Sequence, residues 1–194
     1  MRDEYVALDL ETTGLNAEED AIIEIGAARF REGEVLETYN TLINPGRSVP
    51  DRVTAITGIR TDDVIGKPYM RDVLSDLRHF LGNSPIVGHR IDFDLSFLAH
   101  YHVADSNSSF DTYDLASVLL PSEARYNLTN LTGTFKVELE HAHRALEDAV
   151  ATGKLYWALW QRILELPLGT LQEIVESSRN FDWNAKPNAS VKMG

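Results

Sequence analysis

A short apolar segment that ends in two carboxylates constrains the fold of this chain more than any other feature. The segment is Tyr5-Val6-Ala7-Leu8, and Asp9 and Glu11 follow it. Its length and its β-branched and aromatic residues predict a buried strand. Because side chains alternate across a strand, Asp9 and Glu11 would point to one face. Two carboxylates placed there repel each other and lose hydration, which favours a cation between them.

The same segment has a plainer interpretation. Thr12-Thr13-Gly14 follows Glu11 and supplies hydroxyl groups and a glycine, which are typical of a turn. A lone Asp-x-Glu is compatible with a strand that ends in such a solvated turn. The segments further along the chain therefore decide between the two interpretations.

The remaining pattern predicts a three-strand meander followed by alternating helices and short strands. Residues 21–30 and 35–43 have strand-like patterns separated by a short turn, and Asn44-Pro45-Gly46 ends the meander. Beyond it we predict helices over 49–56, 70–81, 93–101, 142–166 and 168–175, and short strands over 85–89 and 110–112, the second leading into a helix through Leu120; Asn127 is a predicted helix cap. This order indicates an α/β fold with a mixed sheet and helices on its faces. Ligands of such open sheets bind at the carboxyl ends of strands, where Asp9 and Glu11 would lie.

Composition limits the class of protein. The 194 residues, 43% of them hydrophobic, fit one domain, which we place at residues 1–179 with a polar, flexible tail at 180–194. The absence of cysteine excludes disulfides and thiolate metal sites. Neither a long apolar run nor a signal-peptide pattern is present, so we expect no membrane association and a cytoplasmic location. The net charge of −12 argues against charge-driven adhesion to nucleic acid, but not against a substrate gripped locally through metal ions.

Two later motifs match the first in kind. Gly88-His89 ends a predicted strand, and Phe93-Asp94 opens the next helix. His143 and Asp148 lie near the start of the longest predicted helix. Five positions correspond to about 140° around an ideal helix. His143 must therefore lie at or before the helix start if it is to share a site with Asp148.

Taken together, these motifs resemble the DEDDh (DnaQ-like) family of 3′–5′ exonucleases. The resemblance rests on Asp9-x-Glu11-Thr12-Thr13-Gly14, Gly88-His89-x-x-x-Phe93-Asp94 and His143-x-x-x-x-Asp148, in this order over roughly residues 4 to 160. The family includes proofreading subunits of DNA polymerases and exonuclease domains fused to polymerases and helicases. The resemblance implies a ribonuclease H-like fold: a mixed five-stranded sheet with an antiparallel three-strand meander and helices on both faces. It also implies a nucleic acid 3′ end as substrate, with DNA favoured over RNA, and a polymerase or helicase as partner or fused domain.

The resemblance assigns a role to each motif, and the chemistry agrees. Asp9, Glu11, Asp94 and Asp148 would hold two divalent cations, Mg²⁺ or Mn²⁺, which prefer carboxylate oxygens. His143 would be the general base, since its unperturbed pKa near 6.5 suits proton removal from water. The residues expected to contact substrate are Thr12, Thr13, Gly14, Leu15, His89 and Phe93.

Several alternatives stay open. His141 competes with His143, although the family spacing to Asp148 selects His143. Phe93 could be a core residue instead of stacking on a base. Arg90 stands where the family often has Asn, and it could pair with a carboxylate or hold a phosphate. For the whole chain, the alternatives are an RNA-directed exonuclease of the ribonuclease T or oligoribonuclease type, and a non-catalytic module that binds a polymerase or helicase.

Overall fold

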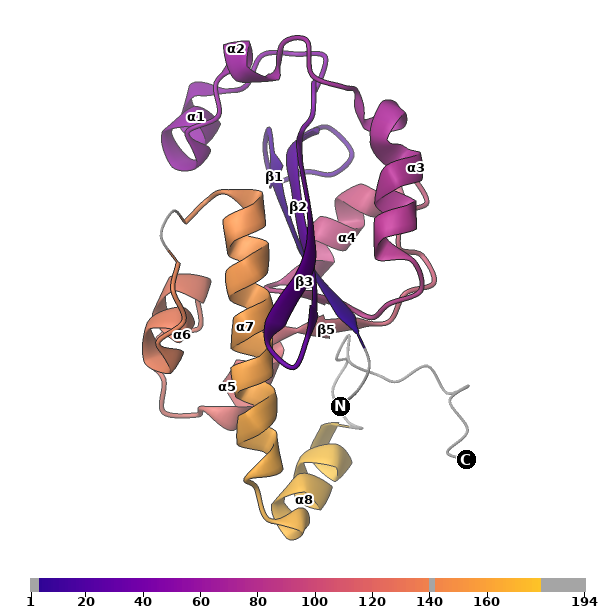
Figure 1. Cartoon of the computed structure of the whole chain (residues 1–194). Helices are drawn as coiled ribbons and strands as arrows, with labels where there is room; N and C mark the ends of the chain where they lie inside the picture. Colours follow the sequence, from indigo (N-terminus) through magenta and orange to yellow (C-terminus); the bar gives the residue numbers. More distant parts are fainter. Residues whose placement is uncertain (1–3, 140–141, 179–194) are drawn as a thin grey trace.

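The computed structural model describes residues 4–139 and 142–178, and it contains the predicted mixed five-stranded sheet (Figure 1). The strands lie in the order β3-β2-β1-β4-β5. β1 pairs with β2, and β2 with β3, in antiparallel fashion, whereas β4 is parallel to both β1 and β5. The strands are β1 (Tyr5–Thr12), β2 (Ile22–Arg31), β3 (Glu34–Leu42), β4 (Ile86–Gly88) and β5 (Ser109–Asp111). The sheet therefore changes from antiparallel to parallel at β1.

Eight helices surround this sheet within the described residues. They are α1 (Asp51–Thr57), α2 (Thr61–Val64), α3 (Met70–Leu81), α4 (Ile91–Ala99), α5 (Thr112–Leu119), α6 (Leu128–Phe135), α7 (Ala145–Leu164) and α8 (Leu168–Ser178). The predicted helix over 70–81 has the observed bounds of α3, and the Asn127 side chain caps α6 as predicted. The one-turn α2 was absent from the prediction because four residues are too few for a periodic pattern.

Three predicted helix starts were wrong by two or three residues, the first being that of α1, which begins at Asp51 and not at 49. α4 begins at Ile91, before the predicted residue 93, because the Asp111 carboxylate accepts the N–H groups of Arg90 and Ile91. α7 begins at Ala145 and not at 142, because Arg144 has extended backbone and His143 has a left-handed φ of 70°. The predicted tail 180–194 lies outside the described residues, and the domain boundary at 179 stays a prediction.

The two faces of β1 bury different helices. Val6, Leu8 and Leu10 belong to the core cluster formed with α3 and α4. Tyr5 and Ala7 point to the other face, where they pack with residues of α7 such as Tyr156. α7 and the α3–α4 pair accordingly lie on opposite sides of the sheet (Figure 1). Since Asp9 and Glu11 continue the series of Tyr5 and Ala7, their side chains are directed to the α7 side.

Trp157 and Trp160 of α7 lie outside its fully buried face. Both are only half-buried, whereas Leu155, Tyr156 and Leu159 are fully buried. Trp157 lies over the β2–β3 turn, where a Cβ on Gly33 would come within 2.5 Å of its ring. The helix therefore turns its smaller apolar side chains toward the sheet.

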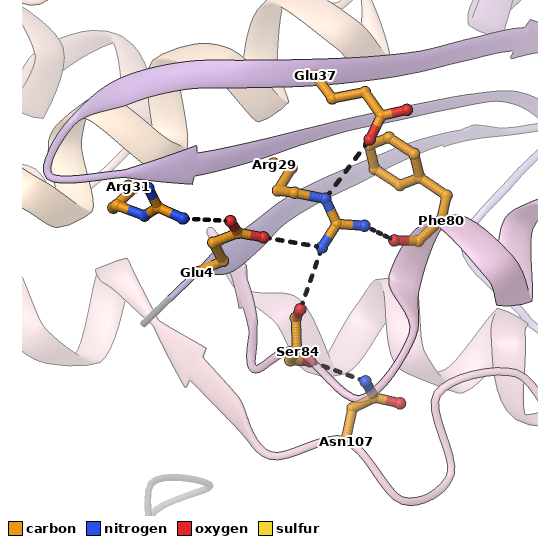
Figure 2. A network of polar contacts seen from close by, with 7 residues as sticks. All are labelled: Glu4, Arg29, Arg31, Glu37, Phe80, Ser84 and Asn107. Atoms are coloured by element: carbon orange, nitrogen blue, oxygen red, sulfur yellow. Dashed lines mark hydrogen bonds and ion pairs between the residues drawn. The ribbon is translucent and has the colours of Figure 1, made fainter. Parts of the chain in front are cut away.

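A polar network ties the sheet together at the opposite end of β1 from Asp9 and Glu11 (Figure 2). The Arg29 guanidinium forms ion pairs with Glu4 and Glu37, each at 3.6 Å, and donates hydrogen bonds to Ser84 Oγ and the Phe80 carbonyl. It also lies 5.2 Å from the centre of the Phe80 ring. One side chain thus joins β2 and β3 to the segment that leads from α3 into β4.

Close contact between β2 and α7 generates a prediction about Gly26. A Cβ at this position would lie 2.1 Å from the backbone of Ala145 and Leu146, so Gly26→Ala must push the start of α7 off the sheet. We expect the free energy of unfolding to fall by about 1–3 kcal/mol, as for an overpacked core. Urea denaturation of the wild type and the variant measures this difference.

Gly133→Ala is the matched control. Gly133 lies in α6 with open space around its missing Cβ. The same substitution there should raise the free energy of unfolding by about 0.5–1 kcal/mol, because alanine favours the helix over glycine. Equal stability of Gly26→Ala and the wild type would show that α7 does not approach β2 so closely.

Candidate active site

The predicted carboxylate pair lies at the carboxyl end of β1. Asp9 and Glu11 are in register with Gly26 and Glu24 of β2, and β1 is also the strand on which parallel pairing with β4 begins. A regular strand from Tyr5 to Glu11 brings both carboxylates to the α7 side. The ladder is irregular between Glu11 and Thr12, so the regular strand ends directly after the pair.

Asp94 reaches the same place from α4. Its side chain is buried, and its Oδ1 accepts the N–H of Leu10, between the two carboxylates of β1, at 2.9 Å. Asp111 holds the start of α4 by accepting the N–H groups of Arg90 and Ile91, both at 3.0 Å, and it also accepts that of Tyr113 at 2.7 Å. Asp111 therefore has a structural role, and Asp92 is exposed.

His143 and Asp148 meet at the start of α7. Asp148 is buried, and its Oδ2 accepts the backbone N–H of His143 at 2.8 Å. His143 lies before the helix with an exposed side chain, as the five-residue spacing predicted. One ligand atom each of Glu11, His143 and Asp148 lies within 4.8 Å of the other two. The first and third motifs therefore share one site.

Mutual repulsion and burial dominate the electrostatics of this site. Burial raises the pKa of Asp9 well above its usual value, and the carboxylates of Asp94, Asp148 and Glu11 raise it further. Burial likewise raises the pKa of Asp94 and of Asp148. The pKa of Glu11 is raised to about 7 by burial and by Asp148 and Glu24. Carboxylate oxygens are the ligands that hard divalent cations prefer. A bound cation would offset the repulsion and the burial that raise these pKa values.

Sequence reasoning missed Glu24, which lies beside this cluster. Its side chain is 1% exposed on β2, opposite Glu11, and it accepts two hydrogen bonds from the Arg144 guanidinium and one from the N–H of Ala145. The available signal was a single glutamate inside the apolar segment of residues 21–30.

A cavity of about 670 Å³ opens next to Glu11. Of the residues predicted to contact substrate, Thr12, Gly14, Leu15 and Phe93 line it. Leu15 is 87% exposed, which leaves its side chain available to a ligand. The prediction missed the opposite wall, which comes from α1 and includes Arg52, Val53, Ile56 and Thr57.

Thr13 and His89 do not line this cavity. The Thr13 hydroxyl donates to Asp20 and accepts the N–H of Ala21, so it holds the loop after β1. His89 Nδ1 lies 2.9 Å from Thr112 Oγ1 at the start of α5, and burial lowers the pKa of its ring. In these positions the two side chains hold the loop after β1 and the start of α5, and their contact with substrate stays a prediction.

Arg90, the departure from the family pattern, has left-handed backbone with a φ of 65°. Its guanidinium lies over the Tyr113 ring, 4.6 Å from the ring centre. Asparagine tolerates this conformation better than most residues, which gives a physical reason for its frequent occurrence there.

The sheet order defines a ribonuclease H-like α/β protein, and β1, α4 and α7 bring acidic side chains together at one end of β1. The chain belongs to the exonuclease family, whose pattern matches residues 6–156. The family depends on divalent metals, and the clustered acidic and histidine side chains fit that requirement.

Individual relatives agree with this assignment. The chain is 32% identical over 157 residues to the DNA polymerase III subunit epsilon of Aquifex aeolicus, covering 78% of each protein. It is 37% identical over 178 residues to the PolC-type DNA polymerase III of Oceanobacillus iheyensis, which covers 89% of this chain but only 12% of that protein. The solved structure of exonuclease X in complex with 5′ overhanging duplex DNA has a TM-score of 0.69 at 26% identity and covers 81% of this chain and 91% of its own.

The raised pKa values predict how stability depends on pH without metal. The folded-state pKa of Glu11 is about 7, above its usual 4.5, so its stabilising contribution is fully present below 4.5 and is lost as pH rises through about 7. Asp9, Asp94 and Asp148 are shifted in the same direction. In EDTA, Glu11→Gln should therefore gain stability relative to the wild type as the pH rises from about 5 to about 8. The free energy of unfolding is the quantity compared.

Urea denaturation across this pH range measures the difference, and Glu173→Gln, at an exposed glutamate of α8, is the control. Addition of a divalent cation should remove the advantage of Glu11→Gln, because the cation stabilises only the charged site. A difference that does not change with pH would contradict the raised pKa of Glu11.

Proposed function

We propose that this chain is a 3′–5′ exonuclease domain that hydrolyses DNA from single-stranded or frayed 3′ ends to 5′-mononucleotides. The supporting observation is the convergence of Asp9, Glu11, Asp94, Asp148 and His143 beside a cavity that is open to a nucleotide. Kinship with the epsilon subunit and with exonuclease X, which was solved with duplex DNA, favours DNA over RNA.

Two Mg²⁺ or Mn²⁺ ions held by the four carboxylates would neutralise charge at the scissile phosphate and activate the attacking water. Asp94 and Asp148 accept the backbone N–H groups of Leu10 and His143, which holds their carboxylates in place for a cation. Leu15 and Phe93 would contact the terminal base across the cavity. His143, exposed and at the edge of the carboxylate cluster, would take the proton of the attacking water.

The proposal also covers the proteins with which this domain would be associated. A PolC-type polymerase and an exonuclease named DinG from Staphylococcus epidermidis, which is 30% identical over 186 residues, support association with a DNA polymerase or helicase, as subunit or fused domain. A cytoplasmic location and a domain spanning 1–179 belong to the same proposal. Among the described residues, no helix has the length and apolarity needed to cross a membrane.

Direct assays test the reaction. With 3′-labelled single-stranded DNA and Mg²⁺ or Mn²⁺, we expect stepwise release of 5′-mononucleotides and no reaction in EDTA. A 3′-phosphate should block the reaction, since it adds negative charge where the site would receive a hydroxyl. The equivalent RNA should react more slowly. Cleavage of closed circular single strands would indicate an endonuclease, and faster hydrolysis of RNA would indicate an RNA-directed enzyme.

The role of His143 is tested by His143→Ala. A general base contributes about 10²–10⁴ in rate and little to binding. We therefore expect kcat to fall by about that factor, while the affinity for Mn²⁺ and for DNA changes little. Asp148→Asn should lose both kcat and Mn²⁺ affinity. Steady-state kinetics and Mn²⁺ titration separate the two effects.

His141→Ala is the control, because His141 stands two positions earlier in the sequence and lacks the five-residue spacing to Asp148. It should retain the wild-type kcat. If His141→Ala were inactive and His143→Ala active, the assignment of the base would be wrong.

A further inference from the structure

An ion pair between Glu24 and Arg144 joins β2 to the residue that precedes α7. Arg144 Nε donates to Oε2 of Glu24 at 3.1 Å, and Arg144 Nη2 donates to Oε1 at 2.8 Å. The backbone N–H of Ala145 also donates to Oε2, at 3.1 Å. The two-pronged arrangement fixes the guanidinium in orientation as well as in distance. Both carboxylate oxygens of Glu24 are therefore engaged by the segment that begins α7.

This arrangement separates Glu24 from the carboxylates proposed to bind metal. Glu24 is directly opposite Glu11 on the neighbouring strand, so the two side chains share one face of the sheet. Ligand atoms of Glu11 and Asp148 lie together with that of His143, whereas both oxygens of Glu24 accept hydrogen bonds from Arg144 or Ala145. A fifth carboxylate would add repulsion to the cluster, and the guanidinium offsets its charge.

Arg144 is also the peptide neighbour of His143, whose ring nitrogen lies within 4.8 Å of ligand atoms of Glu11 and Asp148. His143 has left-handed backbone, and its N–H is held by Asp148 at 2.8 Å. Its side chain is exposed, so packing contributes little to the ring position. The backbone on both sides of the ring is therefore what places it: Asp148 holds the N–H, and Glu24 holds the following residue.

We propose that the Glu24–Arg144 pair is a positioning element that sets the His143 ring over Glu11 and Asp148. The inference rests on the proposed function, because the position of His143 matters only if His143 is the base. Anchoring of α7 as a whole does not require the pair. The helix also packs through Ala149, Tyr156 and Gly153, the last in contact with Phe30 and Ala7 of the sheet. Loss of the pair should therefore loosen the segment before α7 and leave the helix in place.

Arg144→Gln tests this in the full chain with 3′-labelled single-stranded DNA and Mn²⁺. Misplacement of a reacting group by about 1 Å lowers the rate by roughly 10²-fold, so we expect kcat to fall by about that factor. The KM for DNA should stay at the wild-type value, and the Mn²⁺-induced rise in melting temperature should not become smaller, because the uncompensated charge of Glu24 attracts the cation. Arg144→Lys keeps the charge but not the two-pronged geometry, and it should recover part of the lost kcat. Its kcat gives the same information if Arg144→Gln does not fold.

The decisive comparison is made in a His143→Ala background. A residue that acts through His143 has no further effect once the ring is gone, so Arg144→Gln should leave the residual kcat of His143→Ala unchanged. If Arg144→Gln lowered the kcat of His143→Ala by a further factor, the two residues would act independently and the proposal would be wrong. A raised KM would also overturn the proposal by making Arg144 a substrate contact, since its 44% exposed side chain also lines a cavity beside α1. A loss of Mn²⁺ affinity would overturn it as well, by showing an effect through Asp148.

The same assays distinguish failure of this inference from failure of the proposed function. Wild-type kcat in His143→Ala would show that the histidine is not the base, whatever Arg144→Gln does. If kcat fell in His143→Ala but stayed at the wild-type value in Arg144→Gln, the proposed function would stand and only the positioning role would be wrong.

Discussion

Repulsion among buried carboxylates at the end of β1 is the constraint on which the rest of this structure depends. Asp94 is buried and Asp9 is half-buried, and the pKa of each is raised well above its usual value. Such a group of charges opposes folding unless cations bind to it. The sheet makes the arrangement possible because its change from antiparallel to parallel pairing brings the ends of β1 and β4 to one edge. Helices α4 and α7 then deliver the remaining ligands from opposite faces.

The carboxylates of the site also hold its backbone together. Asp94 accepts the N–H of Leu10, Asp148 accepts that of His143, and Glu24 accepts that of Ala145. Each bond joins a helix start to a strand or to the preceding loop. Charge-assisted bonds of this kind are stronger than neutral ones, and the bond to Ala145 also satisfies a donor that the start of α7 leaves open. The ligand geometry and the positions of the helices are consequently determined by the same side chains.

The sequence predicted what short-range patterns control. Alternation and helical periodicity identified the meander, α3, the cap at Asn127 and the position of His143 before α7, and the order of motifs indicated the family.

Contacts between distant segments left weaker signals. Neither the bond from Asp111 to Arg90 nor the pairing of Glu24 with Arg144 could be derived from spacing, since residues 21 and 120 positions apart have no fixed relation until the sheet forms. The α1 wall of the cavity was missed for the same reason. Periodicity identified the helix α7 but not which of its large side chains face the sheet, and Trp157 is only half-buried.

Left-handed backbone recurs where the chain enters the two helices that bear Asp94 and Asp148. Arg90 has a φ of 65° and His143 one of 70°, and neither is glycine. Such a residue costs roughly 1–2 kcal/mol, so each needs a local interaction that holds it. The N–H of Arg90 binds Asp111, and its guanidinium lies over Tyr113. The N–H of His143 binds Asp148 itself. The turn at Arg90 is thus held by a residue outside the proposed ligand set, whereas the turn at His143 is held by a proposed ligand. The position of the proposed base is therefore coupled to the same carboxylate that would hold the cation.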